Sequence, residues 1–152
     1  MTLAIPHEPV PGFAELGFFA GTTTREAGSF NLMGDEPASR VVGRWIGLME
    51  ALAPCAVRLA SAHQVHGDRV LEHGDAWAGW LRDTVGADGH LSAAPGTALA
   101  VSLADCVPIF IAHPSGAGAL LHSGWKGTAA RIVLRAISLF GQRGLAVGDL
   151  LV

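Results

Sequence analysis

The sequence predicts a mixed α+β fold, in which a largely antiparallel sheet is combined with two main helices. Residues 103–122 contain two apolar runs of strand length separated by a cluster of turn-forming residues, a pattern typical of an antiparallel hairpin. Apolar side chains recur at helical spacing in residues 41–52 and again in residues 132–140. Residues 56–62 alternate in polarity and add a further strand.

The N-terminal part predicts a strand followed by a long polar loop. Residues 17–20 are short and apolar, as in a strand, whereas residues 21–31 are polar and rich in turn formers. Arg25 and Asn31 lie in this loop, where such side chains either face a site or simply meet water. A helix is expected next, with Asp35 or Ser39 at its start and Pro54 as its stop.

The middle of the chain predicts strands joined by turns. Residues 56–70 read as strand, turn and strand, and they contain His63 and His66. In an extended chain these two histidines point to opposite faces, so at most one joins a given site. Residues 77–81, with two tryptophans, predict a short amphipathic helix, and residues 96–103 predict a strand.

The last third of the chain predicts a helix and a final strand. Gly127 and Thr128 open the helix, and Gly141 or Gly144 ends it. Residues 146–152 are apolar and are expected to begin another strand.

The predicted hairpin brings a thiol close to an imidazole. If its turn centres near residues 115–116, Cys106 lies opposite His122 or one diagonal step away, on the same face of the sheet. The two Cβ atoms are then roughly 5–8 Å apart, near enough to converge on one ion or substrate atom. Asp105 points to the opposite face, so we expect a buried hydrogen-bond acceptor there rather than a ligand.

Composition places the chain among single-domain globular proteins that bind small molecules. A length of 152 residues predicts one domain spanning residues 1–152, and a composition with 50% hydrophobic and 15% charged residues excludes a disordered chain. The formal net charge is −3 and the 10 basic residues are scattered, which argues against nucleic acid or an anionic membrane as partner. No basic leader or spanning segment precedes the fold, so we expect a cytoplasmic protein. With only two cysteines, Cys55 and Cys106, no disulfide framework is inferred, and Cys106, which stands beside an aspartate, is expected to be a ligand or nucleophile.

Five short motifs follow one another along the chain. They are Gln64-Val65-His66-Gly67, Ala87-Asp88-Gly89, Pro95-Gly96, Ala104-Asp105-Cys106-Val107-Pro108 and His122-Ser123-Gly124-Trp125-Lys126-Gly127-Thr128. In order and spacing they resemble those of the bacterial laccase-domain or YfiH-type family, and the resemblance runs from about Phe18 to Val152. Members of that family were named for polyphenol oxidation and are now regarded as purine nucleoside phosphorylases that also deaminate adenosine.

The resemblance implies a catalytic zinc site formed by His66, Cys106 and His122, with copper as the alternative metal. A thiolate and two imidazoles suit zinc, and three protein ligands leave one position open. The implied reactants are adenosine, inosine or S-methyl-5′-thioadenosine together with phosphate, giving free base and ribose 1-phosphate, with adenosine deamination as a side activity. The residues expected to contact substrate are Arg25, Asn31, Gln64 and Lys126.

The chain departs from the family pattern at several positions. Leu103 replaces a threonine, Ser123 an alanine, Lys126 an arginine and His90 an apolar residue. Lys126 keeps the positive charge but lacks the two-pronged guanidinium that suits phosphate. Relatives continue beyond the length of this chain, so we expect a C-terminally incomplete domain, either within a longer gene product or in a homo-oligomer that covers the exposed edge.

Three other functions fit the same residues. Cys106 with His122 as its base would form a thiol hydrolase or deamidase that needs no metal. Two histidines and a cysteine also suit a copper oxidase. The incomplete domain and the altered motif positions are also consistent with a metal-binding domain that does not turn over substrate.

Overall fold

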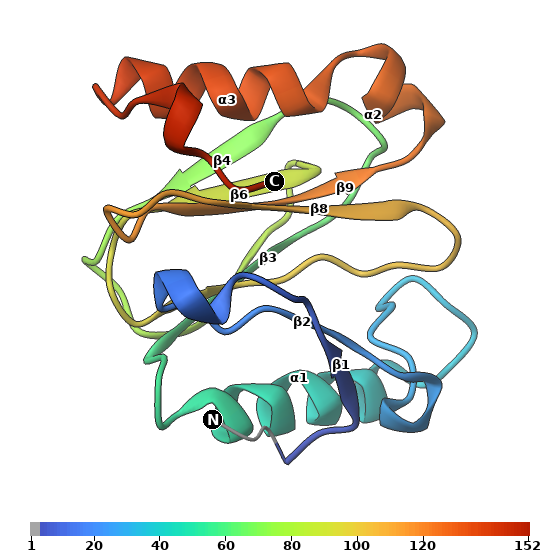
Figure 1. Ribbon diagram of the computed structural model, residues 1–152. Coiled ribbons are helices and arrows are strands. Elements are labelled where there is room, and N and C mark those ends of the chain that lie inside the picture. Colours follow the sequence, from blue (N-terminus) through green and yellow to red (C-terminus); the bar gives the residue numbers. More distant parts are fainter. Residues whose placement is uncertain (1–3) are drawn as a thin grey trace.

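The computed structural model describes residues 4–152 and stacks helices and sheets in layers. In Figure 1, helix α3 lies over a four-stranded sheet, a three-stranded sheet follows beneath it, and helix α1 closes the opposite side. The predicted α+β class with mixed sheets and two main helices is therefore confirmed. No helix in residues 4–152 has the length and apolar character needed to cross a membrane.

The four-stranded sheet carries the predicted hairpin. Its strand order is β4-β6-β9-β8, and β4 runs parallel to β6 whereas the other pairs are antiparallel. Helix α3 covers one face because its apolar stripe packs against this sheet, with Ile132, Ala136 and Phe140 fully buried. The strands are β4 (Val70–His73), β6 (Gly89–Ser92), β8 (Val107–Ala112) and β9 (Gly118–Ser123).

The hairpin register confirms the expected proximity of the thiol and the imidazole. Pro108 lies opposite His122 in the β8–β9 ladder. Cys106 precedes Pro108 by two residues and therefore lies one diagonal step from His122 on the same face. The turn formers between the strands close the hairpin, with the His113 amide donating to the Ala117 carbonyl at 2.9 Å.

The three-stranded sheet is entirely parallel and packs against α1 (Ala38–Leu52). Trp45 of the helix stacks on Trp80 of the sheet, with ring centroids 5.1 Å apart. This contact anchors a second apolar core, built around Val41, Trp45 and Leu59. The strand order is β5-β3-β7, with β3 (Arg58–Ala62), β5 (Gly79–Asp83) and β7 (Thr97–Leu99).

Shorter elements complete the chain. A two-stranded antiparallel sheet joins β1 (His7–Pro9) to β2 (Gly21–Thr23). Helix α2 (Trp125–Ala129) is separated from α3 (Ile132–Gln142) by Arg131, whose φ of 62° interrupts the helical path. The 3₁₀ turns are η1 (Ala14–Leu16), η2 (Arg25–Ala27) and η3 (Val147–Asp149).

Two local predictions are wrong. Residues 77–81 were expected to form a helix, but the chain from Gly79 onward is strand β5, because pairing with β3 overrides the helical spacing of its tryptophans. The apolar strand expected at residues 17–20 is absent, and the strand instead occupies Gly21–Thr23, where the chain pairs with β1.

Other boundaries also shift. The expected strand over 96–103 is limited to Thr97–Leu99, and residues 146–152 form a 3₁₀ turn followed by a single bridge from Leu151 to Ala112. Of the strand, turn and strand expected over residues 56–70, the first strand is β3, whereas the second begins only at Val70 as β4 and belongs to the other sheet. Helix α1 begins after Pro37, and neither predicted capping side chain bonds to its first turn.

Candidate metal centre

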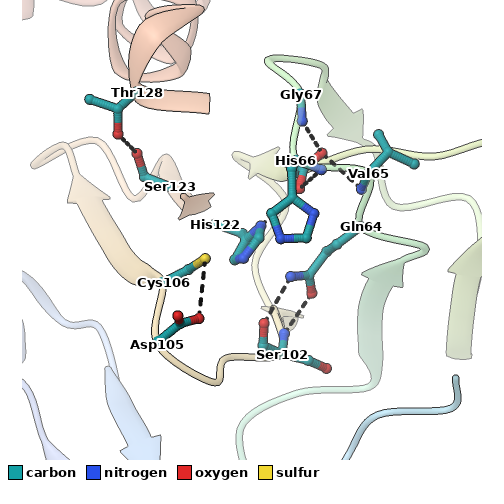
Figure 2. A network of polar contacts seen from close by, with 11 residues as sticks. Gln64, Val65, His66, Gly67, Ser102, Asp105, Cys106, His122, Ser123 and Thr128 are labelled. Carbon is teal, nitrogen blue, oxygen red and sulfur yellow. Dashed lines mark hydrogen bonds and ion pairs between the residues drawn. The ribbon is translucent and has the colours of Figure 1, made fainter. Parts of the chain in front are cut away.

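Three side chains from distant segments converge at one end of the β8–β9 hairpin. His66 comes from the loop after β3, Cys106 directly precedes β8, and His122 lies near the end of β9. Their ligand atoms all lie within 4.8 Å of one another. Figure 2 shows the imidazoles of His66 and His122 side by side, edge to face, with centroids 4.9 Å apart. His63 stays outside this group, so one of the two histidines of this segment joins it, although both lie in a loop and not in an extended strand.

A buried carboxylate fixes the orientation of His122. Asp88 is completely buried at the head of β6, and its Oδ1 accepts a hydrogen bond from Nδ1 of His122 at 2.8 Å. Because an ionised carboxylate only accepts hydrogen bonds, Nδ1 carries the proton and Nε2 is left with its lone pair. Carboxylate support of this kind holds an imidazole in the tautomer that a metal needs.

The same carboxylate holds the loop that carries His66. The backbone N–H groups of Val65, His66 and Gly67 donate to Asp88 at 3.1, 2.9 and 2.8 Å. His66 adopts φ of 61°, a left-handed conformation that is unusual for a residue with a side chain. The three bonds converging on Asp88 compensate the cost of that conformation, so one buried residue connects two of the three candidate ligands.

The pKa values of the Asp88 carboxyl and the Cys106 thiol are shifted in opposite directions. Burial alone would raise the pKa of Asp88, but the bonds from His122 and from the loop amides together lower it below its ordinary value. The pKa of the Cys106 thiol is raised by desolvation and by the neighbouring negative charge of Asp105. In the absence of a cation, the site therefore opposes thiolate formation.

Close packing around the thiol explains a glycine in the His-Ser-Gly-Trp motif. A Cβ at Gly124 would lie 2.9 Å from Sγ of Cys106 and 3.3 Å from Cδ2 of His66. The missing side chain lets the chain turn from β9 into α2 beside the sulfur. Ser123, which departs from the family pattern, bonds through its hydroxyl to Thr128 at 2.9 Å.

The residues present fit a metal ion. Two imidazoles and a sulfur converge, Asp88 presents the free nitrogen of His122, and the glycine leaves room beside the sulfur. His122 is buried whereas His66 is exposed, so the cluster is supported from within and open on one side. Three protein ligands with an open side are typical of a catalytic rather than a structural zinc site.

The expected role of Asp105 is filled by another residue. Asp105 is exposed, with its Oδ1 3.9 Å from Sγ of Cys106, so the prediction of a buried acceptor at that position is wrong. Asp88 is that acceptor. Its sequence signal is an acidic residue between Ala87 and Gly89 at the entrance to a strand buried along its whole length. A charged side chain in such a place requires several hydrogen-bond partners.

A cavity of about 860 Å³ opens beside the site and includes Cys106 in its wall. Arg25 and Asn31 both line it, so the structure brings two of the predicted substrate-contacting residues to the same space. Asn31 Oδ1 also accepts a hydrogen bond from the amide of Met33, which stabilises its own loop. Five phenylalanines also line the cavity: Phe13, Phe18, Phe19, Phe30 and Phe110.

Gln64 and Lys126 do not line this cavity. Both polar ends of the Gln64 amide bond to the backbone of Ser102, as Figure 2 shows. Lys126 is exposed in α2, and its Nζ lies 5.6 Å from the ring centroid of Trp125.

Comparison with known proteins gives consistent matches. The sequence profile of the family described as multi-copper polyphenol oxidoreductase laccase matches residues 19–152. A purine nucleoside phosphorylase of Mycobacterium bovis is 36% identical over 140 residues, which is 85% of this chain and 54% of that protein. Another, from Bacteroides thetaiotaomicron, is 33% identical over 158 residues, covering 91% of this chain and 57% of that protein. The chain thus spans about half the length of these relatives.

Solved structures show the same architecture. The crystal structure of YlmD from Geobacillus stearothermophilus superposes with a TM-score of 0.83 at 28% identity, covering 99% of this chain and 62% of that one. The Bacillus licheniformis protein YfiH superposes with a TM-score of 0.77 at 23% identity, covering 98% of this chain and 61% of that one, and supports the fold alone.

Proposed function

The chain belongs to the multi-copper polyphenol oxidoreductase laccase family, and from this premise we propose that it forms the metal-binding part of a zinc-dependent purine nucleoside phosphorylase. The observation that carries the proposal is the cluster of His66, Cys106 and His122, whose ligand atoms lie within 4.8 Å of one another. Relatives at 33–36% identity carry the name purine nucleoside phosphorylase.

The three residues would hold the ion, and Asp88 would keep His122 in the binding tautomer. When bound, zinc acts as a Lewis acid and keeps one coordination position for a ligand that is not protein. Zinc is favoured over harder cations because the set contains one sulfur and two nitrogens.

The cavity beside Cys106 is the proposed nucleoside site. Its volume of about 860 Å³ falls in the range of small-molecule pockets, and its phenylalanines suit the faces of a purine. Arg25 contributes a guanidinium that can pair with two phosphate oxygens, and Asn31 offers an amide. Gln64 supports the wall through Ser102, and Lys126 adds a positive charge on the exposed side of α2.

The proposed reaction transfers a glycosyl group to phosphate. A phosphate oxygen forms a bond to C1′ of the ribose, the bond from C1′ to the purine nitrogen breaks, and the base leaves with that electron pair and takes up a proton. The chain's part is to hold both reactants in reach of each other. Adenosine deamination, in which water adds to the amino-bearing carbon and ammonia leaves, is the proposed side activity.

A thiol hydrolase is the second candidate, because Asp88, His122 and Cys106 lie in the order acid, imidazole and thiol. This alternative gives no role to His66, whose imidazole lies in the same cluster. Copper-dependent oxidation is less well supported, since residues 4–152 bring together one such cluster and a multicopper centre needs several.

The test is to incubate metal-analysed protein with adenosine, inosine or S-methyl-5′-thioadenosine, with and without phosphate, and to separate free base from deaminated nucleoside. Phosphate-dependent release of base from zinc-containing protein is the expected result. Turnover of esters or amides by zinc-free protein would favour the thiol hydrolase. Bound zinc without any turnover would identify a metal-binding domain.

A further inference from the structure

The segment that carries Cys106 has little secondary structure to hold it. Strand β7 ends at Leu99, the Ala100 amide still donates to the Ala60 carbonyl at 2.9 Å, and β8 begins only at Val107. Residues 101–106, which we call the thiol loop, lie between these points without helix or strand. An irregular loop of this kind positions a side chain well only if something else fixes its backbone.

Gln64 supplies that fixation. Its Nε2 donates to the Ser102 carbonyl at 2.8 Å, and its Oε1 accepts from the Ser102 amide at 2.6 Å. Within residues 4–152, these are the two hydrogen bonds that reach the backbone of the thiol loop. The side-chain amide thereby imitates the paired bonds of one rung in an antiparallel ladder.

Gln64 also stands in the segment that carries another candidate ligand. It precedes His66 by two residues, and Ser102 precedes Cys106 by four. Asp88 accepts hydrogen bonds from the amides of residues 65–67 and from the imidazole of His122. The loop of residues 64–67 is therefore tied to both other ligand-bearing segments, by Gln64 to the thiol loop (Figure 2) and through Asp88 to His122.

We propose that Gln64 is a positioning residue, which sets the place of the Cys106 sulfur relative to His66 by holding the thiol loop through Ser102. It acts on the loop and not on the substrate. Two substitutions separate its chemistry from its size. Gln64→Glu keeps the shape but removes the donor and places a negative oxygen against the Ser102 carbonyl, and Gln64→Leu removes both bonds.

The first measurement is amide hydrogen exchange in metal-free protein, which does not depend on the proposed function. The Ser102 amide is the thiol-loop amide bonded to Gln64, so it should exchange much faster than wild type in Gln64→Leu. It should exchange faster by a smaller factor in Gln64→Glu, which keeps the acceptor oxygen but loses the bond to the Ser102 carbonyl, while α3 and β9 keep their protection. Gln142→Glu and Gln142→Leu are the matched controls, because Gln142 is exposed on α3 and its side chain bonds to Ser138 of the same helix, at 3.2 Å. These controls should leave exchange in the thiol loop unchanged.

The second measurement is metal affinity, and it rests on the proposed zinc site. Zinc should bind about 10–100-fold more weakly to the Gln64 variants, which is the usual loss when a residue that orients a metal ligand is replaced. In the cobalt-substituted variants, the sulfur-to-cobalt charge-transfer band should weaken more than the ligand-field bands, a change that general destabilisation would not produce.

Folded Gln64 variants with wild-type exchange in the thiol loop would overturn the inference. So would a zinc affinity within twofold of wild type. If wild type itself bound no zinc, the proposed function would fail, and the exchange measurement would still decide the role of Gln64.

Discussion

The protein contains two clusters of imidazoles, and they differ in what surrounds them. At the candidate metal centre, His122 bonds to the carboxylate of Asp88 at 2.8 Å, and His66 is exposed. In the four-stranded sheet, Nε2 of His73 lies 2.9 Å from Nδ1 of His90, and both rings are buried. His90 Nε2 is buried without a hydrogen-bond partner among the described residues.

This contrast shows that the partners around a buried histidine decide whether it can serve as a metal ligand or only as a packed core residue. Burial lowers the pKa of His90 to about 3, with a smaller contribution from the nearby His73, so the pair stays neutral and serves packing. His122 is equally buried, but a carboxylate fixes its proton and leaves a nitrogen facing a sulfur and a second imidazole. Burial with an acidic partner prepares a ligand, whereas burial without one yields an uncharged core residue.

The largest effect should come from removing the sulfur at the metal centre. Cys106→Ala should reduce zinc from about one ion per chain to almost none, because two histidines alone leave the tetrahedral set half filled. Elemental analysis after dialysis measures this. Cys55→Ala is the matched control, since Cys55 is exposed, lies outside the cluster, and its thiol bonds to the Leu52 carbonyl at the end of α1. If Cys106→Ala kept as much zinc as Cys55→Ala, Cys106 would not be a ligand, and metal binding would not distinguish the two histidine clusters.

The next effect tests the carboxylate that separates the clusters. Asp88→Asn replaces one acceptor oxygen with an NH₂ group that faces N–H donors, so the loop and His122 both lose support. We expect zinc affinity to fall about 10–100-fold and the thermal midpoint to drop. Calorimetric titration and thermal melting measure the two changes. Wild-type values in both would show that Asp88 does not organise the centre.

The buried pair of His73 and His90 should make the folded state less stable at acidic pH. The folded-state pKa of His90 is about 3, below the value of roughly 6.5 expected for the unfolded chain, so the unfolded state binds more protons between these limits. Stability should therefore be complete above the unfolded pKa and fall as pH decreases, by about 2 kcal/mol from this residue between pH 7 and pH 5.

Urea unfolding of metal-free protein at both pH values measures that loss, and His90→Leu should show a smaller difference between them. Asp88 contributes a loss of the same sign at lower pH, because its pKa is depressed in the folded state and its stabilisation disappears as pH falls through that depressed value. An unchanged pH difference in His90→Leu would mean that the pair does not control acid stability.

The sequence predicted one side of the metal centre better than the other, for a physical reason. Cys106 and His122 belong to a hairpin whose register follows from its turn, so their proximity could be reasoned locally. The position of His66 depends on a left-handed φ and on bonds to Asp88, 22 residues away, which no local pattern encodes. Only the resemblance to a family indicated that it belongs with the other two.

The fold shows the same division. Helices α1 and α3 follow from apolar spacing, because each buries one continuous stripe. Strand β5 does not, since the spacing of Trp77 and Trp80 suits a helix and its parallel pairing with β3 is long-range. Gln64 could not be assigned from its motif either, because its partner Ser102 lies 38 residues away.

The smallest effect should come from the acidic residue beside the thiol. Asp105 is exposed and lies outside the cluster of candidate ligands, and its one contact there is from Oδ1 to Sγ of Cys106 at 3.9 Å, so we expect it not to be needed for zinc binding. Asp105→Asn should therefore keep about one zinc ion per chain, while the pKa of the Cys106 thiol falls slightly in metal-free protein, because a nearby negative charge that raises it has been removed. Zinc analysis and the pH dependence of alkylation with iodoacetamide measure the two results. Comparison with Asp88→Asn makes the test sharp, because each substitution removes one carboxylate near the candidate ligands and only Asp88 is buried. If Asp105→Asn lost zinc as completely as Cys106→Ala, the assignment of the supporting carboxylate to Asp88 alone would be wrong.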